Sequence, residues 1–410
     1  MAVVGIASGI WLVARSAKAN DNAVPGDNGG SHIIAEHEVT EEELELYEIG
    51  YKLDYIEKLI DTYFLFDEET ERKDPMDWMY LGYVASLQDP YSSYYSEEEY
   101  KSLIESTEGE YCGIGVMVSQ NVYTGLVTVV KVFKDAPADV AGMLPGDIIT
   151  AVEGMEISGM DLSLVVSDHI KGEEGTEVSL TVYRESIDDY VDLTMTRRIV
   201  QNPTVEFEML EEKIGYIALS SFEDVSTAQF IGAVDTLEEQ GMQGLIVDLR
   251  NNGGGVVNAA EDIADYLIPD GKDIVSFKGK GVEDSTYVAK DGHQLDIPIA
   301  VLVNGESASA SEVLTGALKD HGLATIVGTK TFGKGIAQGI FPLPDGSALK
   351  LTTAYYYVPS GECIHKEGIE PDIVVELDEE LETLVEIPKE DDNQIRAAVE
   401  ALLEEIEEAD

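Results

Sequence analysis

The sequence predicts a multidomain α+β protein, and three observations lead to this prediction. The chain has 410 residues, which is enough for two or three domains. Hydrophobic residues make up 44% of it, so folded cores can form over most of its length. Short β-like runs fill the middle of the chain, strand–turn–helix units follow them, and helical patterns lie near both ends.

The charge balance is strongly acidic and narrows the possible partners. The chain carries 81 acidic and 26 basic residues, for a formal net charge of −55. Such a charge argues against nucleic acid or an anionic membrane surface as a partner, and it suggests a salt-tolerant surface. The two cysteines, Cys112 and Cys363, form neither a disulfide framework nor a metal-ligand pattern, so we expect two buried thiols, no metal and no cofactor.

The first residues are expected to direct the protein out of the cytoplasm. Met1–Ala14 is an apolar run that is short for a membrane span, and the Ala-Lys-Ala sequence at 17–19 resembles a signal-peptidase site. We therefore expect residues 1–19 to be a signal or membrane-anchor segment of an exported protein of the cell envelope, periplasm or intermembrane space, with a buried helix as the alternative. Residues 20–39, rich in Gly, Asn and Asp, are expected to form a linker.

Residues 40–108 are expected to form a helical N-terminal domain. Thr40 precedes three glutamates, as an N-cap does, and a second helix begins near Pro75. Asp89-Pro90 forms a turn before a third helix, which Ser96 caps. We expect this turn and helix to contribute packing and no chemistry.

Residues 109–198 are expected to form a β-rich domain with two short helical stretches at 138–141 and 162–169. Its Gly113-Ile114-Gly115-Val116 segment could present successive N–H groups to a carboxylate, beside a strand edge that accepts an extended peptide. A purely scaffolding β-domain is the alternative interpretation.

The chain then shows repeated strand–turn–helix units. Ile214–Leu219 and Gly244–Leu249 are expected to be buried strands, followed by helices at 227–240 and 256–267. The glycines at 253–255 lie between the second strand and its helix, where they would let the backbone approach a substrate carbonyl closely.

A third unit carries a serine at a strand-to-helix turn. Ile299–Val303 predicts a strand, and the pattern becomes helical from Ser309 until Gly322. Free N–H groups and the helix dipole at such a turn suit the oxyanion of a tetrahedral intermediate. However, Ser309 and Glu312 also fit an ordinary capping box, so the local pattern leaves both interpretations open.

A lysine between two glycines follows this unit. The segment Gly333-Lys334-Gly335 has Gln338 four residues after the lysine. A turn with a solvated lysine would give the same local pattern.

The two segments together resemble the carboxyl-terminal processing proteases, which are tail-specific serine peptidases of the S41 type. SASASE at 307–312 is similar to the nucleophile motif of this family, TFGKGIAQ at 331–338 is similar to its lysine motif, and the 25-residue separation also agrees. The resemblance implies a crotonase/ClpP-like α/β protease core at 199–385 with an inserted PDZ domain at 109–198. APADVAGMLPGDIITAVEG at 136–154 is similar to the core of that PDZ domain.

The resemblance also implies roles for individual residues. Ser309 would be the nucleophile, Lys334 the general base and Gln338 the side chain that orients the lysine. The N–H groups of Ala310 and Gly254 would form the oxyanion hole.

In the PDZ domain, the resemblance implies that substrate contacts come from the glycine-bearing loop and one lysine: Gly113, Ile114, Gly115, Val116 and Lys171. Family members usually carry arginine at the position of Lys171, a residue linked to communication between PDZ and protease domains. Lysine keeps the charge but lacks the planar guanidinium fork, which makes this coupling less certain here. Near the end of the core, Glu362 and Cys363 also depart from the family pattern.

The proposed chemistry makes a demand on the environment of Lys334. An unperturbed lysine has a pKa of about 10.4, and lowering it to near 7 requires about 4–5 kcal/mol of differential stabilisation. Burial is the available means, because it disfavours the ammonium form. We therefore predict that Lys334 occupies a dry pocket without a carboxylate beside it.

The C-terminal segment, 386–410, is expected to contain an amphipathic helix over 393–408. Its apolar stripe either docks on the body of the chain or pairs with another chain, and we favour dimerisation. The expected partners are thus a protein or peptide substrate with a free C-terminus and a second copy in a homodimer, which is tethered to a membrane if the N-terminal anchor is retained.

Two functions from different classes remain open. The first is an exported serine endopeptidase whose PDZ domain captures the C-terminus of its substrate. The second is a catalytically inactive PDZ scaffold that binds protein C-termini in the cell envelope. A Ser/His/Asp triad is disfavoured, because none of the six histidines lies in a triad motif and G-x-S-x-G is missing around the candidate serines.

Overall fold

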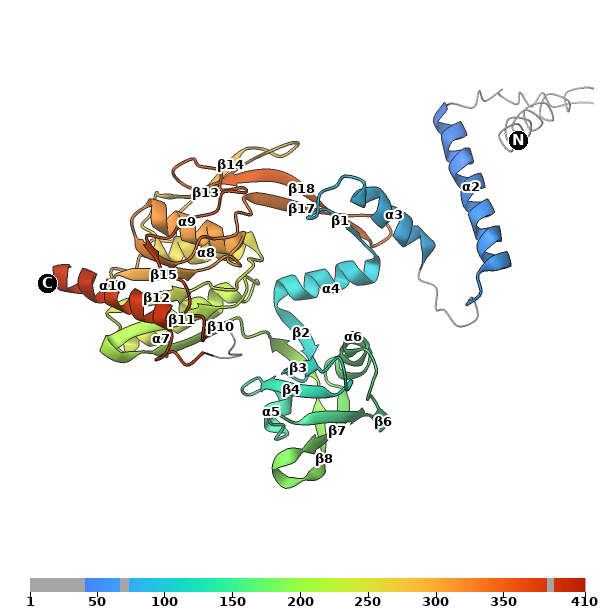
Figure 1. Ribbon diagram of the computed structural model, residues 1–410, viewed down its shortest axis with the longest axis horizontal. Helices are drawn as coiled ribbons and strands as arrows, with labels where there is room; N and C mark the ends of the chain where they lie inside the picture. The colour runs from blue at the N-terminus through green and yellow to red at the C-terminus, as the bar shows by residue number, and fades with distance from the viewer. Residues whose placement is uncertain (1–40, 67–73, 382–386, 410) are drawn as a thin grey trace, which may run out of the picture. The chain divides into compact units, whose positions relative to one another are not determined.

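The computed structural model describes residues 41–66, 74–381 and 387–409 (Figure 1). They belong to two units, one ending at Lys73 and the other beginning at Asp74. The first unit contributes the helix α2 (Glu41–Tyr63). The expected signal segment at 1–19 and the linker at 20–39 lie outside the described residues. No helix in the described part of the chain has both the length and the apolar character needed to span a membrane.

The second unit begins with two capped helices and a short strand between them. Asp74 caps α3 (Pro75–Ala85) by accepting the N–H of Met76. Ser96 and Glu99 form a capping box at the start of α4 (Glu97–Glu108), which confirms the expected cap at Ser96. The strand β1 (Ser93–Tyr95) was not predicted, since three residues give no periodicity.

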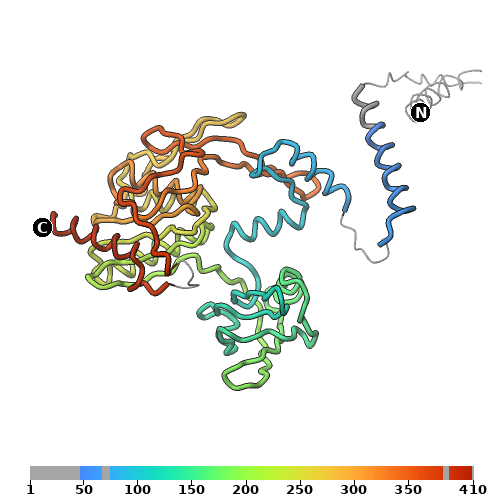
Figure 2. The backbone as a smooth tube through the Cα atoms, in the orientation of Figure 1, coloured from blue at the N-terminus to red at the C-terminus, as the bar shows by residue number. Residues whose placement is uncertain are grey.

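The next domain is built on a five-stranded path, β3-β4-β5-β7-β8, with β6 paired to β5. β3 lies at an edge of this sheet. The chain enters the domain through β2 and leaves it through β9, and these two strands pair antiparallel with each other (Figure 2). The elements of this domain are β2 (Glu110–Gly113), β3 (Val116–Gln120), β4 (Val127–Val132), α5 (Pro137–Val140), β5 (Ile148–Val152), β6 (Met155–Glu156), α6 (Leu162–Leu164), the π-helical turn η1 (Val165–Ile170), β7 (Glu177–Arg184), β8 (Asp189–Thr196) and β9 (Arg198–Gln201).

The core that follows contains a six-stranded sheet in the order β10-β11-β12-β15-β16-β19. The four central strands run parallel, as repeated strand–helix units require. The elements of this layer are β10 (Val205–Met209), β11 (Ile214–Leu219), α7 (Ser226–Glu239), β12 (Gly244–Asp248), α8 (Val257–Leu267), β15 (Ile299–Val303), α9 (Ala310–Asp320), β16 (Ala324–Gly328) and β19 (Ile373–Val374).

A second sheet of antiparallel strands packs through β13 on the helices α8 and α9. Its path is β1-β18-β13-β14, and β17 also pairs with β18. The strands are β13 (Asp273–Gly279), β14 (Ser285–Val288), β17 (Ile336–Pro342) and β18 (Ala348–Tyr357). β17 begins within the lysine motif, two residues after Lys334, and its pairing with β18 places Gln338 opposite Thr352.

The two faces of the six-stranded sheet are covered by different helices. The side chains of one face pack with α7, α8 and α9 in the largest hydrophobic cluster. On the other face, α10 (Asn393–Ala409) buries Ile395, Ala398 and Leu402 against strand residues such as Ile246 and Leu302. The expectation that this helix forms a dimer contact is therefore wrong, because its apolar stripe covers the sheet of its own chain.

The docking of α10 predicts a specific loss of stability. Leu402 is fully buried, so Leu402→Ala should lower the free energy of unfolding by about 2–5 kcal/mol through lost apolar contact and a residual cavity. Chemical denaturation measures this change. Glu404→Ala, on the exposed side of the same helix, is the matched control and should change stability by less than about 0.5 kcal/mol. Equal stability of the two variants would contradict the docking.

Candidate active site

Ser309 stands at the turn between β15 and α9, directly before the first residue of the helix. Its backbone has φ 56° and ψ −114°, a conformation that costs a non-glycine residue on the order of 1–3 kcal/mol. The residue is 8% exposed. A strained serine at the start of a helix is the arrangement that presents a hydroxyl beside unpaired helix N–H groups.

The two neighbouring serines hold this turn in place. The hydroxyl of Ser307 donates to the Leu249 carbonyl oxygen at 2.7 Å, and it accepts the N–H of Asn304. The hydroxyl of Ser311 donates to the Asn252 carbonyl oxygen at 2.8 Å. Both bonds tie the serine turn to the segment after β12.

The buried carboxylate of Glu312 connects the serine turn to the lysine loop. One oxygen accepts the backbone N–H of Ser309 at 2.9 Å and that of Lys334 at 2.8 Å. The other accepts the Thr331 hydroxyl at 2.6 Å and the Gly333 N–H at 2.7 Å. The sequence showed Glu312 only as part of a capping box, whereas the structure makes it the junction between both motifs.

Lys334 is half-buried, and its environment acts on its charge in both directions. Burial lowers the pKa of the amine below its ordinary value, and the positive charge of Lys350 lowers it further. The carboxylates of Glu312 and Asp89 raise the pKa. The prediction that no carboxylate lies beside Lys334 is therefore wrong, because Glu312 holds its backbone N–H; in the described part of the chain, however, the amine makes no ion pair.

The structure does not join the expected catalytic side chains by hydrogen bonds. Among the described residues, no hydrogen bond links the Ser309 hydroxyl to Lys334 Nζ, which lies over the Tyr91 ring at 4.7 Å from its centroid. Gln338 turns its amide toward the Ile336 carbonyl oxygen, at a long 3.4 Å, and not toward the lysine. The two motifs predicted from the sequence do meet through Glu312, but in this conformation no hydrogen bond joins the side chains of the expected dyad.

Gly254 lies where an oxyanion-hole glycine would be needed. A Cβ on this residue would come within 2.8 Å of Ser309 Cβ and 2.9 Å of the Ala310 nitrogen, and its φ is +101°. Its N–H, however, donates to Asn252 Oδ1 at 2.9 Å, so the expectation of a free donor at Gly254 needs correction for this conformation. The N–H of Ala310, the first residue of α9, meets no acceptor among the described residues.

Three further residues near Lys334 were missed by the sequence analysis. Tyr91 and Asp89 come from the turn to which packing alone was assigned, and Lys350 comes from β18. Lys350 Nζ lies 5.3 Å from the Tyr95 ring centroid, a second lysine–tyrosine pair beside the first. No local sequence pattern could identify these contacts, since they form only when β1 pairs with β18.

The histidines of the described part of the chain offer no alternative base. His365 packs its backbone against Gly335, and burial lowers the pKa of its ring. Its Nδ1 is buried without a partner. Within the described residues no histidine is hydrogen-bonded to Ser309, which agrees with the preference against a Ser/His/Asp triad.

One group of carboxylates in the described residues lies close enough together to hold a cation. It comprises Asp265, Asp270 and Asp291, with ligand atoms within 4.8 Å of one another. Asp265 already accepts the N–H groups of Lys290 and Asp291, and Asp270 accepts that of Gly292. The carboxylates of Asp265 and Asp270 therefore hold the loop at residues 290–292.

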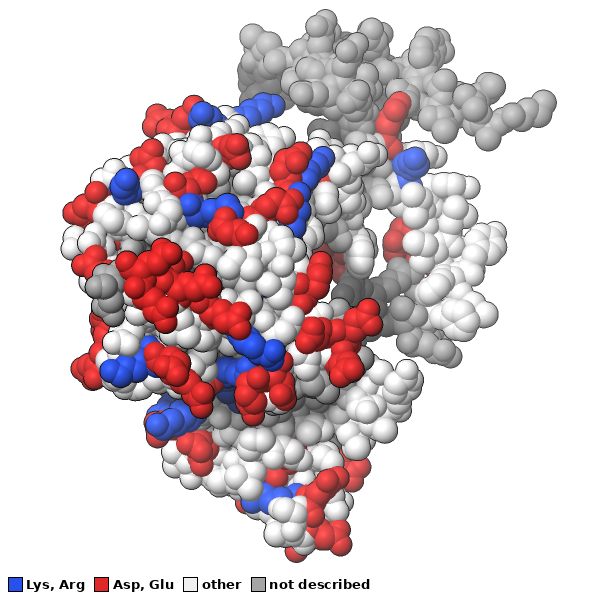
Figure 3. Space-filling view, turned by 60° about the vertical axis from the view of Figure 1, so that its left-hand side comes forward, with Lys and Arg blue, Asp and Glu red and all other residues white. Residues whose placement is uncertain are grey.

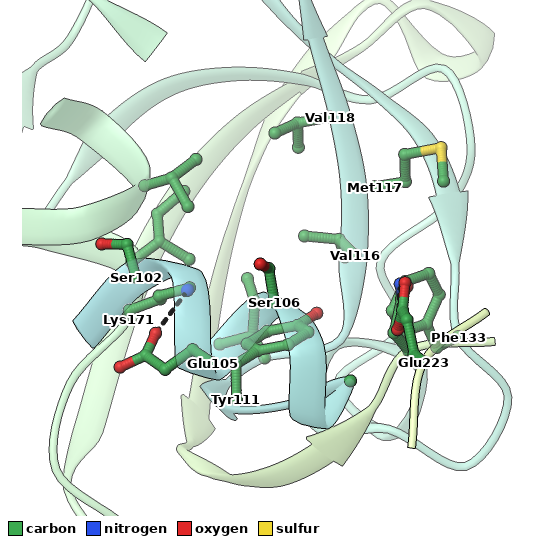
Figure 4. A pocket seen from close by; sticks show the side chains of 15 residues that line it. Ser102, Glu105, Ser106, Tyr111, Val116, Met117, Val118, Phe133, Lys171 and Glu223 are labelled. Carbon is green, nitrogen blue, oxygen red and sulfur yellow. Dashed lines mark hydrogen bonds and ion pairs between the residues drawn. The ribbon is translucent and has the colours of Figure 1, made fainter. Parts of the chain in front are cut away.

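A cavity of about 330 Å³ runs along β3 and the π-helical turn η1 of the β-rich domain (Figure 4). Apolar side chains from these two elements and from the loop before β3 line it, among them Ile114, Val116, Val118, Val166 and Ile170. The edge strand β3 pairs only with β4 in the described structure, so its outer edge is open to an extended peptide.

The loop that begins β3 is fixed by its own backbone. The carbonyl oxygens of Ile114 and Gly115 accept the N–H groups of Ala138 and Phe133. Gly115 has φ +77°, and a Cβ there would come within 2.3 Å of Ala136 Cβ, so no other residue fits.

Lys171 lines one end of the cavity. Its amine pairs with Glu105 of α4 at 3.1 Å and lies 5.2 Å from the Tyr111 ring centroid, as Figure 4 shows. The cavity is therefore bordered by the β-rich domain and by the helix that leads away from the Tyr91 segment.

The surface around these sites is acidic. On the face drawn in Figure 3, Asp and Glu side chains form broad patches with scattered Lys and Arg among them. This distribution agrees with the net charge of −55.

Comparisons with known proteins agree with this architecture. Residues 213–375 match peptidase family S41, and residues 112–195 match the PDZ domain. A carboxy-terminal-processing protease of Bartonella bacilliformis is 41% identical over 301 residues, which cover 72% of this chain and 68% of the relative.

Two further similarities support the same assignment. A protein of Staphylococcus aureus (strain bovine RF122 / ET3-1) described as "Probable CtpA-like serine protease" is 38% identical over 299 residues, covering 72% of this chain and 59% of the relative. A solved S41-type structure from Bacteroides fragilis has a TM-score of 0.52 at 18% identity, covers 82% of this chain and 92% of its own, and supports the fold alone. The chain belongs to peptidase family S41, among the PDZ-bearing serine proteases of the carboxy-terminal-processing type.

Proposed function

We propose that this protein is a serine endopeptidase in which Ser309 is the nucleophile, Lys334 is the general base, and the PDZ groove captures the C-terminus of the substrate. The observation that carries the proposal is the carboxylate of Glu312, which binds the backbone N–H groups of both Ser309 and Lys334. It fixes the two motifs at one site, where burial lowers the pKa of the lysine.

The chemistry follows from these positions. The neutral amine of Lys334 removes the proton of the Ser309 hydroxyl, and the oxygen attacks the carbonyl carbon of the substrate. The Ala310 N–H and the positive end of α9 stabilise the oxyanion. The ammonium then gives its proton to the leaving amine, and a water molecule hydrolyses the resulting ester with the same lysine as base.

This reaction requires a side-chain rearrangement. Lys334 must leave the Tyr91 ring to reach the Ser309 hydroxyl, and Gln338 must turn to hold the amine in that position. The Gly254 N–H joins the oxyanion hole once Asn252 releases it. Catalytic hydrogen bonds often tighten only when substrate binds.

The PDZ groove fits the capture of an apolar C-terminus. Its open strand edge pairs with an extended peptide, its aliphatic lining receives the last side chain, and the loop at Gly113–Val116 faces the terminal carboxylate. Lys171 supplies a positive charge at the same end, after exchanging Glu105 for the carboxylate of the ligand.

A catalytically inactive scaffold is the second candidate. The uncoupled positions of Ser309 and Lys334 favour it, because a binding protein needs the groove and not the dyad. The lowered pKa of Lys334 favours the peptidase, since a scaffold has no need of a buried amine.

We also propose that the protein acts outside the cytoplasm as a homodimer. The location outside the cytoplasm rests on residues 1–19, an apolar run followed by a sequence that resembles a signal-peptidase site. This segment is either cleaved or retained as a membrane anchor. With α10 docked on its own sheet, the exposed tyrosines of α2 (Tyr47, Tyr51 and Tyr55) offer the contact surface for a second copy. Cell fractionation and analytical ultracentrifugation test these two statements.

The dyad predicts two inactive variants. Ser309→Ala and Lys334→Ala should each lower kcat/KM for an unstructured protein with an apolar C-terminus by at least about 10³-fold, because they remove the nucleophile or its base. Lys330→Ala is the matched control, since this amine pairs with Glu370 at the surface, and it should retain activity. Full activity in Lys334→Ala would exclude the dyad, and an inactive wild type that still binds peptide would favour the scaffold.

The charge of Lys350 predicts a shift in the pH profile. Lys334 must be neutral, so kcat/KM should rise as pH passes through its pKa. Lys350→Met removes a positive charge that lowers this pKa, so the pKa should rise and the acidic limb should move to higher pH. Lys350→Arg keeps the charge and should keep the profile. A limb that stays in place in Lys350→Met would contradict this role.

The groove predicts selectivity for a free carboxylate. A peptide with an apolar C-terminus should bind the Ser309→Ala variant at least about 10-fold more tightly than its C-terminal amide, because the amide removes one charge-assisted contact. Fluorescence anisotropy measures both affinities. Equal affinities would show that the groove does not read the terminus.

A further inference from the structure

The amine of Lys334 has a specific aromatic partner. Nζ lies 4.7 Å from the centroid of the Tyr91 ring, a distance at which a cation is attracted to the ring face. We propose that Tyr91 is a positioning residue that holds the ammonium form of Lys334 away from Ser309, so that the lysine leaves the ring as it loses its proton. This inference rests on the proposed role of Lys334 as general base.

Tyr91 is presented to the lysine by a well-connected turn. Its backbone N–H donates to Asp89 Oδ1 at 3.1 Å, and the Ser92 hydroxyl donates to Asp89 Oδ2 at 2.6 Å. The Ser92 hydroxyl in turn accepts the N–H of Thr352 on β18 at 3.1 Å. These bonds anchor the turn that carries Tyr91 to β18.

The ring distinguishes the two protonation states of the amine. The face of an aromatic ring attracts an ammonium ion and has no comparable attraction for a neutral amine. Tyr91 consequently stabilises the inactive, protonated lysine at a distance from the serine. Deprotonation removes the attraction and leaves the side chain available to the Ser309 hydroxyl.

Four other groups lie around the lysine, and two of them favour the charged form as Tyr91 does. Lys350 on β18 opposes the charged form, whereas Asp89 on the turn and Glu312 on α9 favour it. His365, on the loop after β18, packs against Gly335 beside the lysine. Tyr91 is the aromatic contact of the amine in the described structure, and changing its ring leaves these four groups in place.

The experiment measures the protonation of Lys334 without using peptidase activity. The full chain carrying Ser309→Ala is labelled with trace acetic anhydride at a series of pH values, and mass spectrometry follows acetylation of Lys334. Tyr91→Leu should increase the ratio of amine to ammonium at a given pH by roughly 2- to 30-fold, the range expected for loss of a cation–π contact. Tyr91→Phe keeps a ring face and should leave the titration unchanged.

Two further variants serve as a second test and as a control. Tyr91→Trp places the strongest cation-binding ring at the site, so the titration should move in the opposite direction, which decides the question if Tyr91→Leu does not fold. Tyr95→Leu, which removes the ring of the Lys350 pair, is the matched control and should leave the Lys334 titration unchanged. A lower proportion of amine in Tyr91→Leu would mean that the ring acts only by excluding water from the lysine. Either that result or an unchanged titration would overturn the proposal.

The active enzyme provides the second readout. The acidic limb of kcat/KM should move to lower pH in Tyr91→Leu, the reverse of the shift expected for Lys350→Met. If Lys334→Ala kept full activity, the role of the lysine as base would fail while the labelling result stood. If activity required Lys334 but the labelling did not respond to the ring, the role of Tyr91 alone would fail.

Discussion

The carboxylate of Glu312 is the interaction on which the candidate site depends. A buried carboxylate is costly unless its oxygens are fully hydrogen-bonded, and here four donors from two segments satisfy it. Two of the donors are the backbone N–H groups of Ser309 and Lys334, the proposed nucleophile and base, so displacing either segment would leave the buried carboxylate short of donors. These bonds hold the backbone of both motifs, so the rearrangement proposed for catalysis involves the side chains of Lys334, Gln338 and Asn252.

The surroundings of the Lys334 amine act on its protonation in opposite directions. Burial and Lys350 disfavour its charge, while Tyr91, Asp89 and the same Glu312 favour it. The protonation state of a lysine balanced in this way changes with a small alteration of its surroundings. The residues that set the balance come from three separate segments: the turn before β1, the start of α9 and the strand β18.

Much of the fold could be predicted from the sequence because the relevant signals are local. The runs at Ile214–Leu219 and Ile299–Val303 are strands with the expected bounds, and the helix after Ser309 ends just before Gly322. The positions of Ser309 and Lys334 followed from two short motifs. The partners of these residues did not, since Tyr91, Lys350 and Asn252 reach the site only through tertiary contacts.

The surface against which the apolar stripe of α10 packs could not be predicted from the local sequence either. The apolar stripe of α10 could cover a second chain or its own sheet, and only the tertiary structure shows that it buries one face of β12 and β15. The capping box of Ser309 and Glu312 is a pattern that the sequence did reveal, but only in part. The pattern was correctly seen, but its acidic member serves the lysine loop as well as the helix.

The pairing of β2 with β9 has a consequence for how this architecture arose. Glu110 lies opposite Gln201, so the points where the chain departs from the protease core and returns to it are neighbours in space. A whole domain of some ninety residues therefore occupies the place of a hairpin, and its gain or removal would leave the surrounding core topologically intact. The PDZ domain is thus joined to the rest of the chain through one pair of neighbouring strands, which is a simple arrangement for evolution to exchange one such domain for another.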